Sequence, residues 1–385
     1  MPILSALTWL GIAREATLGT AVSPVSFIPV KSPKPENVIK YIKDDGFRGK
    51  AAKTFGQYQS VRHGTFNFEG DAFADTFGYP LVAILGQDGT TGTASGSSTT
   101  LSTAAATGAT TISTAATITV DDYIQIDTGL IAEVRKVTAV TGTGPYTITL
   151  DYALHYAHVS GATVQPLTGS TGLTHTFSLA PNQPPSFTLT TYDGVEIDQF
   201  AGAVCSQVEL KFTPDAGLTF TADFVSFPST VLASATPTYS NTVPFQGWEA
   251  TMTVAGSSEP TLIDFSATIK RDKVDPVFGS TNSQAPRTIF ASTLEHTGKM
   301  TLAFENETQV TNFLNNVQPT VVITFTEPSS AAVLTITMTK CAFDKAVKNF
   351  SKEYVELEID YEAIYNATDN GPGQISLTNN VELYN

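Results

Sequence analysis

The sequence predicts a mainly β protein, and three observations support this class. Of the 385 residues, 23 are Phe and 13 are Tyr, and both are residue types that favour strands. Charged residues make up only 15 %, against about a quarter in typical domains. The apolar residues fall in short runs that alternate with Thr and Ser, which is the two-residue period of a half-buried strand. The length favours two or three domains, and the hydrophobic share of 41 % can fill their cores.

Charge is spread unevenly along the chain. The formal net charge is −15, but residues 31–62 carry eight basic and three acidic residues, a net charge of +5 that leaves −20 for the remainder. A strongly acidic body argues against tight DNA binding, because such binding needs many phosphate contacts from Lys and Arg. The excess of like charge favours solubility.

The cysteines and the N-terminus indicate where the protein folds. Cys205 and Cys341 allow at most one disulfide, and we expect both to be small buried side chains. The N-terminus has no basic segment of the kind that begins a signal peptide. No apolar run approaches the roughly 20 residues of a membrane span. We therefore expect a protein that folds in a cytoplasm and does not insert into a membrane.

Residues 88–167 differ from the rest of the chain. The stretch from Thr90 to Ile118 consists almost entirely of Thr, Ser, Ala and Gly. Short alternating runs follow at 122–127, 133–138 and 146–150, with turn residues between them. The pattern predicts a small all-β module, residues 88–167, inserted into a larger domain.

The parts on either side of this module resemble each other. Three pairs of alternating strands match: 66–69 with 302–305 at an offset of 236, then 187–190 with 334–337 and 208–212 with 355–359, both at an offset of 147. The offsets differ by 89, which is close to the length of the module. The sequence therefore predicts a first unit from residues 1–87 and 168–230 and a second unit from residues 240–385.

Each unit is expected to contain one helix after its first matched strand. In the first unit the apolar residues are Phe73, Phe77 and Leu81, which lie four apart. The helical spacing of the second unit is carried by Val310, Phe313, Leu314 and Val317. Asn306, followed three residues later by Gln309, has the pattern of a capping box.

Several segments of the first unit resemble the major tail tube proteins of long-tailed bacteriophages. They are Gly11 to Pro24, Phe27 to Val30, the strand at Phe66, the helix that ends Leu81 to Gly86, and the hairpin Gly202 to Phe224. The resemblance covers most of the chain outside 88–167. Residues 88–167 resemble the Thr/Ser/Gly-rich β modules that decorate phage tail and adhesion proteins.

The resemblance implies two tandem tail-tube β-sandwich or barrel units, each with a flanking helix. It implies a structural virion protein without catalytic residues, metal or cofactor, assembled in the host cytoplasm into stacked rings that form the tail tube for DNA ejection. Three copies of a duplicated chain would close a pseudo-hexameric ring. The implied partners are further copies of the chain, the tape measure protein, the tail terminator, distal tail proteins, and DNA in transient, sequence-independent passage.

Residues 354–364 alternate regularly, so that one face of the expected strand is acidic. Neighbouring carboxylates on this face would lie about 7 Å apart along the strand. One interpretation is that they line the lumen of the tube, where DNA would meet like charge and slide without binding. The alternative is a solvated outer face. The lumen candidates are Glu356, Glu358, Asp360 and Glu362.

Two long polar segments, 31–62 and 267–298, are expected to be arms that reach neighbouring subunits or rings, because structureless stretches of this length are unusual in compact domains. The basic arm at 31–62 would dock on the acidic body of another copy; stacking of its aromatics on nucleic-acid bases, or a merely solvated loop, are the alternatives. The arm candidates are Lys40, Lys43, Arg48, Lys50, Lys53, Lys270, Arg271 and Lys273.

The chain shows no motif of a catalytic or metal site. His155 and His158 lie three residues apart, but no Cys or further His lies nearby to complete a zinc set. Nucleophile-elbow, zinc-protease and phosphate-loop signatures are absent from the sequence, so an enzyme is not expected. The alternative function is a virion or cell-surface adhesin that binds host glycans through residues 88–167.

Overall fold

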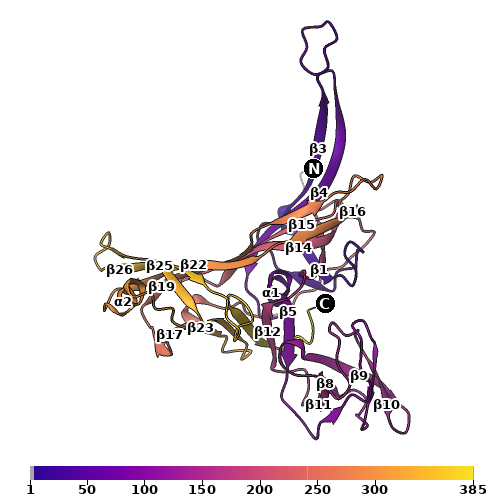
Figure 1. Ribbon diagram of the computed structural model, residues 1–385, viewed down its shortest axis with the longest axis vertical. Coiled ribbons are helices and arrows are strands. Elements are labelled where there is room, and N and C mark those ends of the chain that lie inside the picture. The colour runs from indigo at the N-terminus through magenta and orange to yellow at the C-terminus, as the bar shows by residue number, and fades with distance from the viewer. Residues whose placement is uncertain (1–3, 241, 385) are drawn as a thin grey trace.

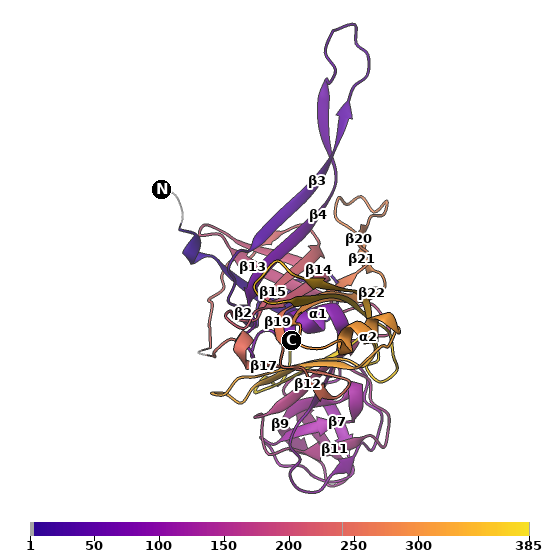
Figure 2. The ribbon, with the colours of Figure 1, turned by 90° about the vertical axis from the view of Figure 1, so that its left-hand side faces the viewer.

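The structure is a computed structural model that describes residues 4–240 and 242–384. The fold is mainly β, as the sequence predicts. Two sheets face each other around a common core, a separate sheet lies at one end of the molecule, and a long hairpin projects from the other end (Figure 1). The view from the side shows the same arrangement (Figure 2). The described residues also form three short 3-10 helices: η1 (Ser5–Leu7), η2 (Gly129–Ile131) and η3 (Gly247–Glu249).

The large sheet has twelve strands. Eight of them lie side by side in the order β3-β4-β15-β14-β19-β22-β26-β25, and the other four extend the sheet beside β14. The eight are β3 (Lys34–Asp44), β4 (Gly56–Asp71), β15 (Thr219–Ser226), β14 (Ile197–Phe212), β19 (Leu262–Arg271), β22 (Leu294–Ala303), β26 (Glu356–Ala363) and β25 (Cys341–Asn349). The four are β1 (Trp9–Arg14), β2 (Ser26–Ile28), β13 (Phe187–Tyr192) and β16 (Thr230–Val231).

A seven-stranded sheet packs against the large sheet. Helix α1 (Gly78–Leu85) contacts strands of both sheets, and all eight of its residues are buried. It ends at Gly86, whose φ of 94° is a left-handed conformation that favours glycine. The strands in order are β18 (Ser257–Ser258), β17 (Ala250–Val254), β23 (Val321–Thr326), β24 (Val333–Met338), β27 (Gln374–Asn379), β12 (Leu173–Leu179) and β5 (Gly86–Thr91).

One hydrophobic core joins both halves of the chain. It contains Phe68 and Phe224, which stack at 5.8 Å between ring centroids, and it continues to Phe265 and Tyr361 in the second half. The strand faces that the sequence predicts as buried point into this core. Examples are Leu357, Ile359 and Tyr361. Cys205 and Cys341 are buried and free, as expected of small core side chains.

Residues 99–166 form a six-stranded sheet with its own apolar core. The runs expected at 122–127, 133–138 and 146–150 are strands, and Ile124, Ile148 and Val164 fill the core between the strands. The sheet order is β6 (Thr99–Thr100), β11 (Thr163–Pro166), β8 (Tyr123–Ile126), β9 (Glu133–Thr141), β10 (Tyr146–Leu150) and β7 (Thr111–Thr114). Strand β5 runs to Thr91 within the seven-stranded sheet, so the boundary expected at residue 88 lies too early in the chain.

The large sheet contains the same arrangement of four strands twice. The block β3-β4-β15-β14 is followed by the block β19-β22-β26-β25, and in each block a helix comes after the second strand. The matched strands at 66–69 and 302–305 lie in or at the end of β4 and β22, which hold the same place in the two blocks. The other two matches relate strands in different places, β13 with β24 and β14 with β26, so those alignments are wrong. Alternating strands resemble one another whatever their position in a sheet.

Helix α2 (Thr308–Leu314) packs against β25 but differs from its expected form. The side chain of Asn306 accepts a hydrogen bond from the backbone of Thr308 at 2.9 Å. Gln309 is buried and donates to Glu259 at 3.0 Å, so its side chain does not close the capping box. Leu314 is 72 % exposed, so part of the predicted apolar face is not covered within the chain.

Candidate assembly surfaces

The four acidic lumen candidates lie on the open face of the large sheet. Their strand, β26, turns Leu357, Ile359 and Tyr361 into the core, and each is at most 2 % exposed. The alternating residues therefore face away from the core, but Glu356 is only 4 % exposed and pairs with Lys352. In the sheet Glu358 lies opposite Thr301 of β22, and Asp360 lies opposite Lys299.

Neighbouring strands supply cations that partly neutralise this acidic row. Asp360 lies 3.5 Å from the Lys299 Nζ on β22 and 4.0 Å from the Lys345 Nζ on β25. The Lys352 Nζ lies 2.7 Å from Glu356 and lowers the pKa of that carboxyl. Strand pairing brings Lys299 and Lys345 to Asp360, which the sequence does not reveal, whereas Lys352 lies only four residues before Glu356 in the chain.

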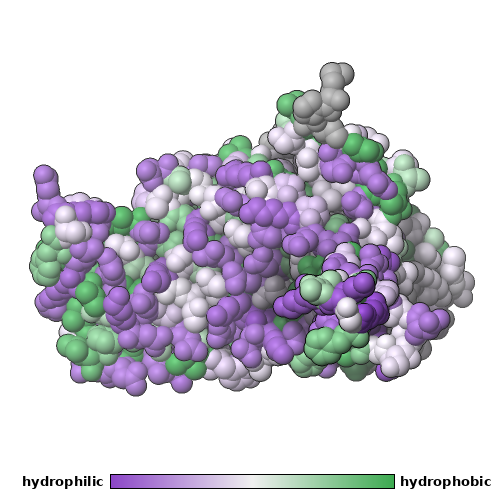
Figure 3. Space-filling view, turned by 90° about the horizontal axis from the view of Figure 1, so that it is seen from above, coloured by the Kyte–Doolittle hydropathy of each residue, from purple (hydrophilic) through white to green (hydrophobic). Residues whose placement is uncertain are grey.

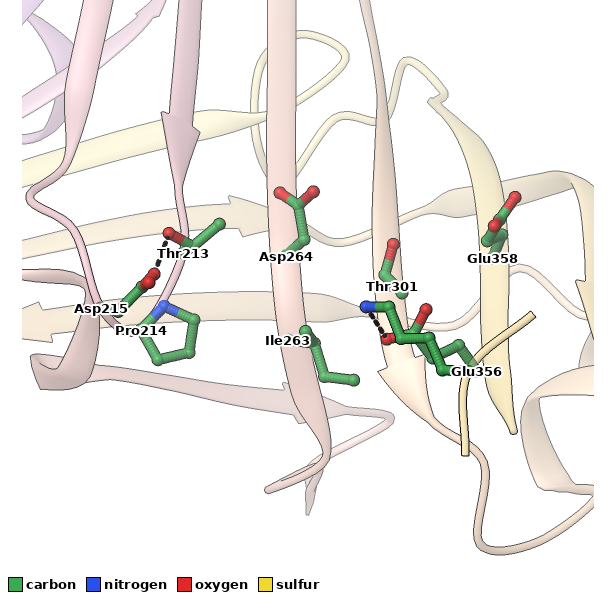
Figure 4. A pocket seen from close by; sticks show the side chains of 9 residues that line it. Thr213, Pro214, Asp215, Ile263, Asp264, Thr301, Glu356 and Glu358 are labelled. Carbon is green, nitrogen blue, oxygen red and sulfur yellow. Dashed lines mark hydrogen bonds and ion pairs between the residues drawn. The ribbon is translucent and has the colours of Figure 1, made fainter. Parts of the chain in front are cut away.

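The acidic row continues into a groove at one end of the sheet. The groove has a volume of about 460 Å³, and its carboxylates come from the β14–β15 turn, β19 and β26 (Figure 4). Pro214 and Ile263 give it an apolar part. The lining residues are Thr213, Pro214, Asp215, Ile263, Asp264, Thr301, Lys352, Glu356 and Glu358.

The basic segment 31–62 is a long hairpin and not a structureless arm. β3 and β4 pair from Lys34 opposite Asn67 to Asp44 opposite Gly56. Beyond the sheet they form a two-stranded ribbon that stands clear of the molecule (Figure 1). Lys40 and Lys43 lie on β3, and the other three cations, Arg48, Lys50 and Lys53, lie in the connecting loop; all five are exposed.

The tip of this hairpin combines cations with exposed aromatic side chains. Phe47 is fully exposed, and Tyr58 on β4 is 60 % exposed. The Arg48 guanidinium pairs with Asp44 and lies 5.0 Å from the centroid of the Phe55 ring. A fully exposed Phe is unfavourable in water, so the tip has the character of a contact surface.

The second expected arm, residues 267–298, folds against its own chain. Between β19 and β22 it forms a hairpin of β20 (Val274–Val277) and β21 (Thr288–Ala291), whose Ile289 packs against Val204 of β14. Lys270 pairs with Glu295 at 2.6 Å, and Lys273 pairs with Asp275 at 2.7 Å.

Arg271 was expected to be one of the exposed arm residues, and this expectation is wrong. It is only 7 % exposed, and its guanidinium donates to the carbonyl oxygens of Ile84 at 2.7 Å and Ser292 at 3.0 Å. A side chain that ties α1 to the β20–β21 hairpin is not available to another subunit. The sequence could not reveal this, because both acceptors are backbone atoms.

The edge of the large sheet at β25 carries exposed apolar side chains. Among the described residues β25 pairs only with β26, and β3 pairs only with β4. Val347 and Phe350 at the end of β25 and Leu314 of α2 are exposed. Seen from above, much of the surface is hydrophilic, and apolar residues are visible at both ends of the molecule, including the end where α2 lies (Figure 3). Val347 lies opposite Glu358 and shares the open face of the sheet, whereas Leu314 lies on the side of the core. We call these three residues, which surround the free edge, the β25 edge patch.

A network of buried charges fixes the six-stranded sheet. Glu133 pairs with the buried Arg135 and accepts hydrogen bonds from the backbone of His155 and Tyr156, both at 2.8 Å. His158 lies between Glu133 at 3.0 Å and Asp127 at 3.1 Å. No group of three or more His, Cys, Asp or Glu within the described ranges could hold a metal ion.

The same network continues into the main body. The Arg14 guanidinium of β1 lies 2.8 Å from His155, and the Tyr156 hydroxyl accepts a hydrogen bond from the backbone of Asp88 at 2.8 Å. Asp88 in turn contacts His175 at 3.0 Å. Burial alone would lower the pKa of His175, but the Asp88 carboxylate raises it above its usual value.

The last described residues of the chain also contact the junction between the six-stranded sheet and the main body. The ring of Tyr384 is 1 % exposed and lies against His175, with 4.7 Å between ring centroids. The Glu382 side chain lies close to the carboxyl of Asp151, which follows β10 of the six-stranded sheet. Burial and this neighbouring carboxyl raise the pKa of Glu382 to about 8. The six-stranded sheet therefore contacts the main body through buried side chains as well as through its connecting segments.

Comparison with known proteins points to one family. A family model described as "Phage tail tube protein" matches residues 125–382, which is 258 of the 385 residues. The match runs from β8 to the residues after β27. No curated protein matches the chain. Within the described part of the chain, none of the helices has the length and apolar character needed to span a membrane.

Proposed function

Because the chain belongs to the phage tail tube protein family, and is thus a structural component of the virion tail, we propose that its copies join edge to edge into rings. The rings stack into a hollow tube through which DNA leaves the virion. The chain carries out no catalysis in this role and needs no cofactor.

The observation that carries this proposal is the repeated strand order of the large sheet. The two blocks meet at β14 and β19, where Gln207 to Phe212 pair antiparallel with Phe265 to Lys270. Both ends of the eight-strand series, β3 and β25, lack a further partner among the described residues. An unpaired strand presents free N–H and C=O groups that favour pairing with another chain. We therefore propose that β25 of one copy pairs with β3 of the next, as β14 pairs with β19 inside the chain.

The proposed number of copies comes from the pseudo-hexameric ring that the resemblance to tail tube proteins implies. Each chain contributes two similar blocks, so three chains would supply the six blocks of such a ring. This supports a trimeric ring of pseudo-sixfold symmetry. The same proposal includes a duplication into two tail-tube units. Unlike separate domains, the two units share one core.

In the ring, the open face of the large sheet lines the lumen. Glu356, Glu358, Asp360 and Glu362 lie on this face, and the six-stranded sheet lies on the far side of the seven-stranded sheet (Figure 1). An acidic surface supplies few phosphate contacts, so DNA passes without tight binding. The six-stranded module projects from the outer wall, because the lumen has to remain open. The tape measure protein, the tail terminator and distal tail proteins are the proposed further partners, and assembly takes place in the host cytoplasm.

The β25 edge patch provides the test of ring formation. We expect Leu314→Asp to abolish rings and tubes seen by negative-stain electron microscopy, because it places a charge in an apolar contact between copies. The matched control is Val159→Asp, which makes the same change at an exposed Val (71 %) on the six-stranded module. Normal rings from Leu314→Asp, or discrete monomers of the unaltered protein, would contradict the proposal.

A further inference from the structure

We propose that a crevice between the main body and the six-stranded sheet binds the carboxylate of a small hydroxylated acid, with the Arg14 guanidinium as its anchor. The crevice has a volume of about 240 Å³. One wall is residues 14–16 at the end of β1, and the other is residues 107–108 and 153–155 of the six-stranded module. The inference goes beyond the proposed function and does not depend on ring formation.

The first argument is that Arg14 has no carboxylate partner within the chain. Its Nη1 lies 2.8 Å from the Nδ1 of His155. Arginine can only donate hydrogen bonds, so the lone pair of this nitrogen is the acceptor. Across residues 4–240 and 242–384, the Arg14 guanidinium takes part in no ion pair. Burial lowers the pKa of Arg14, as expected for a cation that has lost water without gaining an anion.

The nearest carboxylates of the junction are committed to other cations. Asp88 and Glu133 partly offset the effect of burial on the pKa of Arg14, but neither comes within ion-pair distance of it. Asp88 pairs with His175 at 3.0 Å, and Glu133 pairs with the buried Arg135. The planar fork of the Arg14 guanidinium therefore suits a carboxylate from outside the chain, which it can bind through two parallel hydrogen bonds.

The acid in the wall of the crevice, Glu15, is fully engaged with the main body. Its carboxylate accepts hydrogen bonds from two hydroxyls and two backbone N–H groups at 2.7–2.8 Å. The donors are Ser186, Thr188, Gly19 and Gly202. Four donors stabilise the charge of this carboxylate, so it has no need of Arg14 and repels an incoming anion less than a free carboxylate would.

The size and walls of the crevice define the rest of the ligand. Its volume lies below the roughly 300–1,000 Å³ of cavities that bind drug-sized molecules, so the ligand has about one ring. Ala153 and the buried Leu154 provide an apolar wall. Thr107 brings a hydroxyl to the mouth, where it and Ala16 are exposed, so the crevice opens to solvent. A sugar acid of one ring has this size, a carboxylate for Arg14 and hydroxyls for the mouth.

Calorimetric titration of the full chain with glucuronate tests the inference. We expect the unaltered protein to bind glucuronate but not glucose, which has the same ring without the carboxylate. Arg14→Gln should weaken binding at least tenfold. Ala16→Trp should do the same by filling the mouth while Arg14 stays in place, so it decides the matter if Arg14→Gln fails to fold. The matched control is Arg287→Gln, which removes the same charge from an exposed site on the β20–β21 hairpin.

The outcomes separate this inference from the proposed function. Absence of glucuronate binding by the unaltered protein, or binding that neither crevice variant weakens, would overturn it. Inorganic phosphate that competes as well as glucuronate would also overturn the assignment to a carboxylate. Rings and tubes should form normally from Ala16→Trp, since ring formation does not use the crevice. Absence of rings from the unaltered protein would refute the proposed function and leave the glucuronate result unaffected.

Discussion

At the scale of single residues, several interactions between charged groups join residues that are distant in sequence and that the fold brings together. Asp360 meets Lys299 and Lys345 from neighbouring strands, and Glu382 meets Asp151 from the other end of the fold. Alternation along β26 is visible in the sequence, so the acidic face could be predicted. The cations beside it could not, because register depends on the packing of the whole sheet.

Glu382 makes the junction with the six-stranded module sensitive to pH. Its pKa rises from an ordinary value of 4.5 to about 8 in the folded protein, so folding favours the protonated form. The stabilisation is present below pH 4.5 and is lost as the pH rises toward 8. The other charged residues near this carboxyl are Asp151, Arg135 and Lys136. All three are unchanged in the Glu382→Gln variant.

We expect Glu382→Gln to be more stable than the unaltered protein at high pH. The difference in free energy of unfolding should grow by about 1–2 kcal/mol between pH 5 and pH 9, after allowance for partial exposure of the carboxyl. Urea denaturation of both proteins at the two pH values measures it. A difference that stays constant with pH would show that Glu382 is not the titrating group.

At the scale of elements, local patterns predicted the strands well and their neighbours poorly. β8, β9 and β10 follow from short alternating runs bounded by turn residues. The hairpin β3–β4 was expected to be a polar arm, because its exposed faces lack an apolar period. The helical spacing of the sequence extends to Val317, but α2 ends at Leu314, which has no core to enter within the chain. Such surfaces are covered only in an assembly, and a single chain does not reveal the partner.

The boundary of the module leads to a prediction about its removal. Thr91 of β5 lies opposite Thr174 of β12, so residues 92–173 can be replaced by a two-residue Asn-Gly turn. We expect this variant to fold and to form thinner tubes by electron microscopy. Deletion of residues 88–167 should fold poorly, because it removes Asp88 to Thr91 of β5 and with them the carboxylate beside the buried His175. Equal folding of the two variants, measured by thermal denaturation, would contradict the role of these β5 residues.

At the scale of the whole molecule, the decisive feature is a sheet that repeats its strand order and whose strands β3 and β25 have no further partner among the described residues. A duplicated architecture was predicted from the sequence, although only one of three strand matches falls on strands in equivalent places. The predicted units also share one core, which periodicity alone does not reveal. The family match over two thirds of the chain agrees with the structural role of this architecture.

The most direct test of the central claim is a cryo-electron microscopy reconstruction of the assembled tube. The account predicts rings of three copies, with β25 of each copy hydrogen-bonded to β3 of the next and with Glu358 and Asp360 facing the lumen. A reconstruction in which β25 remains unpaired, or in which the open face of the large sheet forms the outer wall, would contradict it.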